Sequence, residues 1–213
     1  MDSEELKNQV FRTTMELCDV GLIRLSAGNI SARDKDGNMA ITPTGLPYSR
    51  MRPVDIVITD LDGQVVDGGL KPSSETPMHT AIYRRLPNVG AVVHTHSVYA
   101  IAFATIGIEI PVVCLEILSV GGPVPIAPYA CPGSSEAGRI ACECFESHPD
   151  LRVLLLRNHG LVAIGENLEQ AFQNAYKCET GAQIYHIALQ TGRTPMALSA
   201  EQIAEIHQRY QKA

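Results

Sequence analysis

The chain has 213 residues, of which 45% are hydrophobic and 19% are charged, the balance of a folded globular protein. A net charge of −6 without a basic run argues against nucleic acid or an anionic membrane as the main partner. No apolar stretch is long enough to cross a bilayer, and the acidic start Met1-Asp2-Ser3-Glu4-Glu5 is unlike a signal peptide. We therefore expect a cytoplasmic protein in which residues 1–213 form one domain.

The first half of the chain predicts one helix followed by short strands. Apolar residues at helical spacing indicate a helix over residues 6–20, and Gly21 stands where it would stop. Turn signals such as Asp36-Gly37 and Asp62-Gly63 then separate four short extended segments. These segments are residues 29–32, 39–42, 55–59 and 64–66.

The second half predicts alternating helices and strands. A helix begins at Thr76, with Pro77 tolerated in its first turn. Strand, helix and strand then alternate through His94, Ala100, Pro111 and Ile126. Next come a helix over 133–146 and paired strands over 152–158 and 161–164. Asn167 with Gln170, and Ser199 with Gln202, are capping-box patterns that open the last two helices, the first running to about Gln190. The fold class is therefore α/β.

Three histidines form a candidate metal site. His94 and His96 project from the same face if residues 91–96 form a strand. His159 follows the apolar run 153–156 and completes a three-histidine set if the two strands lie close. Three neutral imidazoles leave zinc an open position for chemistry. The alternative is a chance His-x-His in a chain with seven histidines, each ring hydrogen-bonded in a core. A structural or surface role is expected for the others, His79, His148, His186 and His207.

The six cysteines, by contrast, include no C-x-x-C pair, and reduced thiols are expected for all of them. Cys142 and Cys144 on a predicted helix would point away from each other, which makes them a poor metal pair.

Turns rich in small and hydroxyl residues supply candidate phosphate donors. Ser26-Ala27-Gly28-Asn29 and Thr42-Pro43-Thr44-Gly45 combine backbone N–H groups with hydroxyls, and Ser73 and Ser74 precede a helix amino terminus. Glu75 is either a residue that complements the helix dipole or a general acid/base beside the metal. Each turn taken alone is equally typical of an ordinary turn.

Several short motifs in order carry a resemblance to a known family. They are Gly28-Asn29, Thr42-Pro43-Thr44-Gly45, Pro72-Ser73-Ser74-Glu75, His94-Thr95-His96, Gly121-Gly122, Ala127-Pro128-Tyr129 and Asn158-His159-Gly160. In this order, and over nearly the whole chain, the sequence resembles the class II aldolase/adducin-head family.

The resemblance implies a three-layer α/β/α sandwich with a central, mainly antiparallel sheet. It implies a homotetramer with fourfold symmetry, in which a neighbouring subunit completes each site, and Glu75 as catalytic acid/base. It also implies Zn²⁺, or another divalent metal such as Co²⁺ or Mn²⁺, on His94, His96 and His159. The positions that hold the substrate phosphate would be Asn29, Thr44, Gly45, Ser73 and Ser74.

The activity that the resemblance implies is aldol cleavage of a ketose 1-phosphate, such as fuculose 1-phosphate, to dihydroxyacetone phosphate and an aldehyde. Other members are 4-epimerases, dehydratases or decarboxylases of sugar phosphates, and the adducin head is a non-catalytic interaction module. The epimerases carry Asp where this chain has Glu75, and the adducin head lacks the metal set. Both differences favour an aldolase.

Two positions depart from the aldolase pattern. Leu115 aligns with a tyrosine that assists proton transfer from the adjacent subunit, and Tyr210 is a poor stand-in for a second tyrosine in the tail. With Leu115 near Cys114, Ile117 and Leu118, an apolar pocket wall is expected. This predicts a 5-deoxypentulose 1-phosphate substrate, such as 5-deoxyribulose or 5-methylthioribulose 1-phosphate. The alternative is that Leu115 packs at a subunit interface and specificity lies elsewhere.

Overall fold

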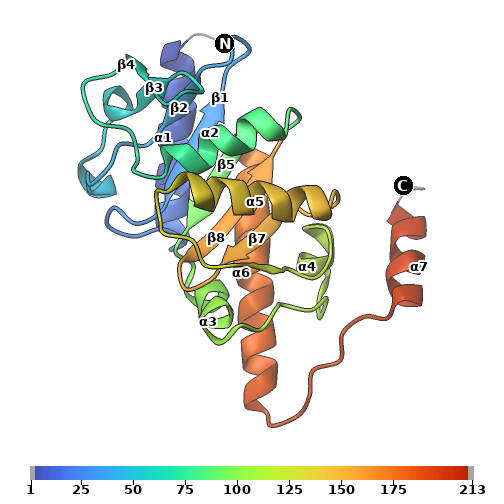
Figure 1. The fold of residues 1–213 in the computed structure, drawn as a ribbon. Coiled ribbons are helices and arrows are strands. Elements are labelled where there is room, and N and C mark those ends of the chain that lie inside the picture. The colour runs from blue at the N-terminus through green and yellow to red at the C-terminus, as the bar shows by residue number, and fades with distance from the viewer. Residues whose placement is uncertain (1–2, 211–213) are drawn as a thin grey trace.

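A computed structural model describes residues 3–210; the side chain of Tyr210 is outside the described part. Within this range a central sheet is covered by helices on both faces (Figure 1). Two apolar clusters, one on each face of the sheet, hold the layers together. The predicted three-layer α/β/α sandwich is confirmed. None of the described helices combines the length and apolarity needed to cross a bilayer.

The sheet has the strand order β4-β3-β2-β1-β5-β8-β7-β6. Neighbouring strands are antiparallel except β6 and β7, so the predicted mainly antiparallel sheet is confirmed. The strands are β1 (Asn29–Arg33), β2 (Met39–Ile41), β3 (Val57–Thr59), β4 (Val65–Asp67), β5 (Ala91–Thr95), β6 (Ile126–Ala127), β7 (Val153–Leu156) and β8 (Gly160–Gly165).

One helical layer contains α2 and α5, and the opposite face of the sheet is covered by α1, α3 and α6, with α4 against α6 (Figure 1). The α-helices are α1 (Ser3–Asp19), α2 (Thr76–Arg85), α3 (Val98–Ile106), α4 (Leu115–Ser119), α5 (Ser135–Ser147), α6 (Leu168–Gln190) and α7 (Ala200–Tyr210). Two short 3₁₀ turns, η1 (Tyr48–Arg50) and η2 (Pro53–Asp55), lie between β2 and β3. Figure 1 shows α7 at the end of an extended segment, and Ile203 and Ile206 of α7 are packed against the apolar cluster that includes residues of α1, α3 and α6.

Side-chain capping explains where the last helices begin. The Asn167 side chain accepts the Gln170 N–H, at 2.9 Å, and starts α6. Ser199 and Gln202 form both bonds of the predicted capping box before α7, at 2.9 and 3.3 Å. For Asn167 only half of the box forms, because the Gln170 Oε1 accepts from the Glu166 N–H instead.

The segment between α3 and α5 is where the predicted elements were partly wrong. The strand expected near Pro111 is only an isolated bridge between Ile110 and Val124. Pro111 has no N–H to continue a ladder, which is why pairing stops there. The short helix α4 was not predicted. It packs on α6, where the absence of a side chain at Gly181 leaves room for Ile117.

Candidate metal centre and active site

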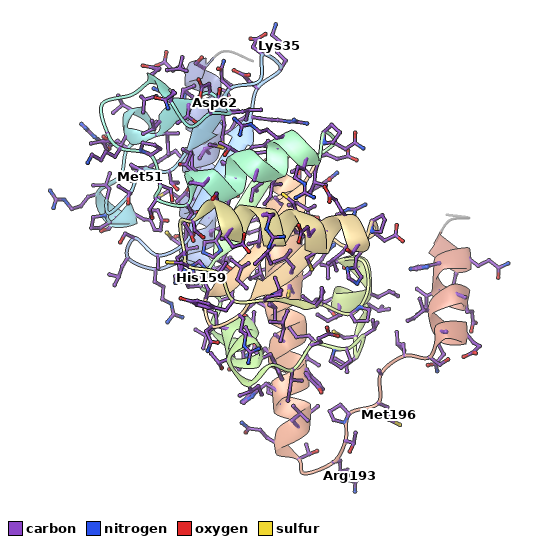
Figure 2. All side chains as sticks on the ribbon, in the orientation of Figure 1. Lys35, Met51, Asp62, His159, Arg193 and Met196 are labelled. Carbon is purple, nitrogen blue, oxygen red and sulfur yellow. The ribbon has the colours of Figure 1, made fainter. Side chains whose placement is uncertain are left out.

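The three predicted histidines come together at one end of the central strands. One ligand nitrogen from each of His94, His96 and His159 lies within 4.8 Å of the others. Their ring centroids are 4.7 to 5.3 Å apart. His94 is buried, His159 is half-buried and His96 is exposed, so the cluster opens to solvent on one side. Figure 2 shows His159 at the end of the strands, where β7 turns into β8.

Strand pairing and the following turn bring the rings together. His94 lies in β5, opposite Val162 of β8, and His96 follows the last residue of β5. His159 occupies the turn between β7 and β8, where Asn158 adopts φ 57°, a left-handed conformation that Asn tolerates. A Cβ at Gly160 would stand 2.7 Å from His94 Cε1 and 2.5 Å from the Thr95 carbonyl oxygen. Only glycine therefore allows the turn to approach His94 this closely.

The orientation of the His94 ring fixes its tautomer. Its Nδ1 lies 2.9 Å from the Leu161 carbonyl oxygen, which can only accept. Nδ1 therefore carries the hydrogen, and Nε2 presents a lone pair to the centre of the cluster. This backbone contact is the orienting bond that metal-binding histidines ordinarily make with their second nitrogen.

Glu75, at the start of α2, faces the same centre. Its Oε2 lies 3.0 Å from His94 Nε2, and its Oε1 lies 3.3 Å from His159 Nε2. Within residues 3–210, Glu75 Oε1 and His94 Nε2 are buried without a hydrogen-bond partner. A carboxylate oxygen and an imidazole lone pair both accept, so their approach requires a cation or a proton between them. The three imidazoles and this carboxylate thus fit a divalent metal ion.

The environment favours the neutral forms of His96 and His159 and the ionised form of the Glu75 carboxylate. Burial lowers the pKa of His159 to about 4 and also lowers the pKa of His96, with the charge of His94 acting in the same direction. Burial alone would raise the pKa of Glu75, but His94, the Asn29 amide and His159 together bring it well below its ordinary value. Neutral imidazoles are the form that binds metal.

The two loops predicted to hold phosphate lie side by side. Pro43 and Pro72 form an isolated antiparallel bridge. Beside it the Thr44 N–H donates to the Lys71 carbonyl and the Ser73 N–H to the Thr42 carbonyl, both at 3.0 Å. Thr44, Gly45 and Ser74 are exposed, whereas Ser73 is buried and its hydroxyl accepts the Glu75 N–H at 3.2 Å. This contact connects the phosphate loops to the carboxylate.

The Asn29 side chain contacts Glu75 and His79, and no contact with the loop hydroxyls is seen among the described residues. It stands opposite His94 in the pairing of β1 with β5, and its Nδ2 donates to Glu75 Oε2 at 2.8 Å. Its Oδ1 lies 2.5 Å from Nε2 of His79. Sequence reasoning gave His79 a structural or surface role, and the ring is fully buried. The contact with Asn29 was missed, because it joins a strand to a helix 50 residues further along the chain.

The chain that leaves His96 is held by a carboxylate from another helix. Glu179 of α6 accepts the N–H groups of Tyr99 and Ala100, each at 2.9 Å, at the start of α3. Ser97, the residue at the N-cap position, makes no capping bond. Its hydroxyl instead lies 2.6 Å from that of Thr95. Glu179 therefore substitutes for a local cap immediately after His96.

Leu115 does not join this cluster within one chain. It begins α4 and is 52% exposed. Figures 1 and 2 show α4 well separated from His159. The predicted apolar pocket wall at Leu115 is therefore not seen beside the histidines of the same chain.

Comparison with known proteins identifies the family of the chain. The family described as "Class II Aldolase and Adducin N-terminal domain" matches residues 8–186. The chain belongs to this family, and class II aldolases are metal-dependent enzymes.

Several characterised relatives are similar over most of the chain. A 5-deoxy-D-ribulose 1-phosphate aldolase of Bacillus thuringiensis is 39% identical, covering 90% of this chain and 88% of the relative. An L-fuculose phosphate aldolase of Escherichia coli K12 is 36% identical, covering 99% of this chain and 96% of the relative. An L-ribulose-5-phosphate 4-epimerase, UlaF, of Salmonella paratyphi C is 35% identical over 87% and 86%. A solved structure of an L-fuculose 1-phosphate aldolase superposes with a TM-score of 0.91 and 32% identity, covering 99% of this chain and 98% of that one.

Proposed function

We propose that the protein is a zinc-dependent aldolase that cleaves a ketose 1-phosphate to dihydroxyacetone phosphate and an aldehyde. The observation that carries this proposal is the meeting of three imidazoles with one buried carboxylate beside a pair of hydroxyl-rich loops. Zinc held by His94, His96 and His159 would act as a Lewis acid toward negative charge that develops on the substrate oxygens.

The residues of the chain divide the remaining work. Thr44, Gly45, Ser73 and Ser74 would hold the phosphate, with Asn29 at the boundary between phosphate and carboxylate. Cleavage breaks the C3–C4 bond, the C4 hydroxyl releases one proton and C3 takes one up. In cleavage, the Glu75 carboxylate would take up a proton, such as the one released by the C4 hydroxyl, and deliver it to C3; in condensation it would remove the proton from C3. Its low pKa provides the base form needed for removal.

For the substrate we favour a 5-deoxypentulose 1-phosphate over fuculose 1-phosphate. Support comes from the exposed apolar Leu115 and from the relative that acts on 5-deoxy-D-ribulose 1-phosphate. This proposal includes a homotetramer, because α4 would have to reach a neighbour's site. A pocket wall without a hydroxyl loses little against a substrate methyl or thioether group, but leaves a sugar hydroxyl unpaired.

The decisive experiment is an assay of the zinc-loaded protein for release of dihydroxyacetone phosphate. 5-Deoxyribulose, 5-methylthioribulose and fuculose 1-phosphates are compared by kcat/KM. Release from at least one is expected, with 5-deoxyribulose 1-phosphate preferred. Preference for fuculose 1-phosphate would refute the substrate proposal alone. No release from any of them would refute the aldolase proposal.

The second candidate is a 4-epimerase, favoured by the similarity to the ribulose-phosphate epimerase. An epimerase would convert L-ribulose 5-phosphate without releasing a three-carbon product. The same protein preparation, assayed for both reactions, distinguishes the two functions.

Metal content provides an independent test. The protein as isolated should contain about one divalent ion per chain, as expected for a three-histidine site. His94→Ala and His159→Ala should each lose the ion and the activity while circular dichroism stays unchanged. Activity that survives a chelator, in protein free of zinc, cobalt, manganese and iron, would contradict the proposed metal dependence.

A further inference from the structure

A continuous chain of buried polar side chains runs from Glu75 into the layer between the sheet and α2. We propose that His79 is a positioning residue for the reaction, acting on Glu75 through Asn29. Beyond Asn29, His79 Nδ1 lies 2.6 Å from Ser31 Oγ, which lies 2.7 Å from the Tyr83 hydroxyl. All five residues are at most 5% exposed. This inference rests on the proposed role of Glu75.

Strand and helix periodicity bring the four supporting groups together. Asn29 and Ser31 are two residues apart in β1 and project to the same face of the sheet. His79 and Tyr83 are four residues apart in α2 and project from the same face of the helix. Met78 and Ile82 of the same helix lie in the apolar cluster on this side of the sheet, and the Arg33 guanidinium lies over the Tyr83 ring. The polar groups therefore have one another as partners.

The donor and the acceptor of each hydrogen bond between Glu75 and Tyr83 follow from the ionised state of Glu75. Ionised Glu75 only accepts, so Asn29 presents its amide nitrogen to Glu75 and its oxygen to His79. His79 must then carry its hydrogen on Nε2, which leaves Nδ1 as an acceptor. Ser31 donates to Nδ1, and its oxygen accepts from the Tyr83 hydroxyl. Each bond sets the direction of the next.

The functional consequence concerns the Asn29 amide. Rotated by half a turn, the amide would place its oxygen against the carboxylate oxygen of Glu75, and two acceptors would repel. The Nε2–H of His79 opposes that rotation because it requires the Asn29 oxygen on its own side. His79 therefore keeps Oε2 of Glu75 hydrogen-bonded, and with it the orientation of the carboxylate toward His94 and His159.

Kinetics of the zinc-loaded enzyme test this role. His79→Leu removes the donor, and kcat should fall by ~10–100-fold, the usual cost of losing an outer hydrogen-bond partner at a metal site. KM and zinc content should stay close to those of the parent protein. His79→Gln, which can again place an N–H near Asn29, should recover part of the loss. The matched control is Ile82→Val, a buried apolar change on the same helix, which should lower stability without lowering kcat.

A purely structural role gives the opposite pattern. If His79→Leu loses stability but keeps the kcat of the Ile82→Val control, the proposal is wrong. If His79→Leu does not fold, Tyr83→Phe removes only the hydroxyl at the far end of the chain. It should lower kcat less than His79→Leu would, and kcat equal to that of the parent protein would then count against the proposal.

A spectroscopic measurement keeps this inference separate from the aldolase proposal. Proton–nitrogen NMR should show His79 as the Nε2–H tautomer. The side-chain amide signals of Asn29 should shift in both His79→Leu and Glu75→Gln. The Nδ1–H tautomer, or Asn29 signals unmoved by the His79 change, would overturn the inference. If every cleavage assay fails, the aldolase function is refuted. The NMR measurements on His79 and Asn29 can still be interpreted, because they do not depend on activity.

Discussion

Along β1, Ile30 and Ala32 lie in the apolar cluster that also contains residues of α1 and α6, whereas Asn29 and Ser31 point to His79 and Tyr83 of α2. Adjacent residues of one strand thus have different roles on the two faces of the sheet. On the first face, burial of apolar area stabilises the fold. On the second, buried polar groups are held in one arrangement, at a cost that their hydrogen bonds offset. Changes on the two faces should therefore separate stability from turnover.

The largest fall in turnover is expected from a change of Glu75, which lies at the end of the buried polar residues between β1 and α2. Glu75→Gln should retain zinc and phosphate binding but lower turnover by ~10²–10⁴-fold, the usual contribution of a positioned acid/base. Single-turnover cleavage measured beside metal analysis would check this. Normal turnover in the variant would remove Glu75 from the mechanism.

The polar face should also make stability depend on pH. Burial lowers the pKa of His79 to about 3 from 6.5, with Glu75 opposing and His94 reinforcing this shift, while Ser31, Tyr83 and Asn29 enclose the ring. Between these values the unfolded chain binds a proton that the folded chain does not. Stability should therefore fall as pH falls through this window, by up to about 1.4 kcal/mol per unit.

The contribution of His79 is isolated by comparison with His79→Gln, using metal-free protein and urea unfolding at several pH values. The variant should have a flatter profile between pH 6.5 and 4. Parallel profiles would show that the titration belongs to other groups, such as His159 or His96.

A smaller effect is expected where Glu179 caps α3. Glu179→Ala leaves the N–H groups of Tyr99 and Ala100 without their acceptor, which costs about 1–3 kcal/mol for a buried donor. Because α3 follows His96, zinc affinity should also weaken. The free energy of unfolding of metal-free protein and competitive zinc titration report the two effects. Unchanged zinc affinity would confine Glu179 to a structural role.

The apolar face of β1 should respond in stability alone. Ile30 lies between Asn29 and Ser31 in sequence but points to the opposite face of the sheet. Ile30→Val removes one buried methylene and should lower the free energy of unfolding by about 0.5–1.5 kcal/mol, with kcat unchanged. Thermal unfolding and steady-state kinetics measure both quantities. A fall in kcat comparable to that of His79→Leu would show that the two faces are not separable.

The smallest effect on catalysis is expected from changes in the two loops that are predicted to hold the substrate phosphate. Thr44→Ala and Ser74→Ala alter exposed hydroxyls and should mainly raise KM, because phosphate contacts are shared by ground and transition states. A fall in kcat at constant KM would contradict their assignment to phosphate.

Sequence patterns predicted the parts of this structure that depend on local periodicity. The alternation that placed His94 and His96 together, and the Ser199 capping box, are features of a few consecutive residues. The chain from Glu75 to Tyr83 could not be predicted in the same way, because it joins β1 to α2 across some 50 residues. Spacing can show that Asn29 and Ser31 share a face, but not which helix covers it. The helix α4 was missed because it depends on a contact with Gly181.

The position of β5 bears on how the site behaves as the protein fluctuates. Residues 91–95 are paired with β1 on one side and with β8 on the other. Their amides should therefore exchange hydrogen for deuterium only through opening of the whole sheet, while those of α7 exchange through local fraying. His94 is thus fixed to the slowest-exchanging part of the molecule. If the three histidines hold an ion as proposed, local fluctuations are expected to free it first at His96 and His159, without unfolding of the sheet.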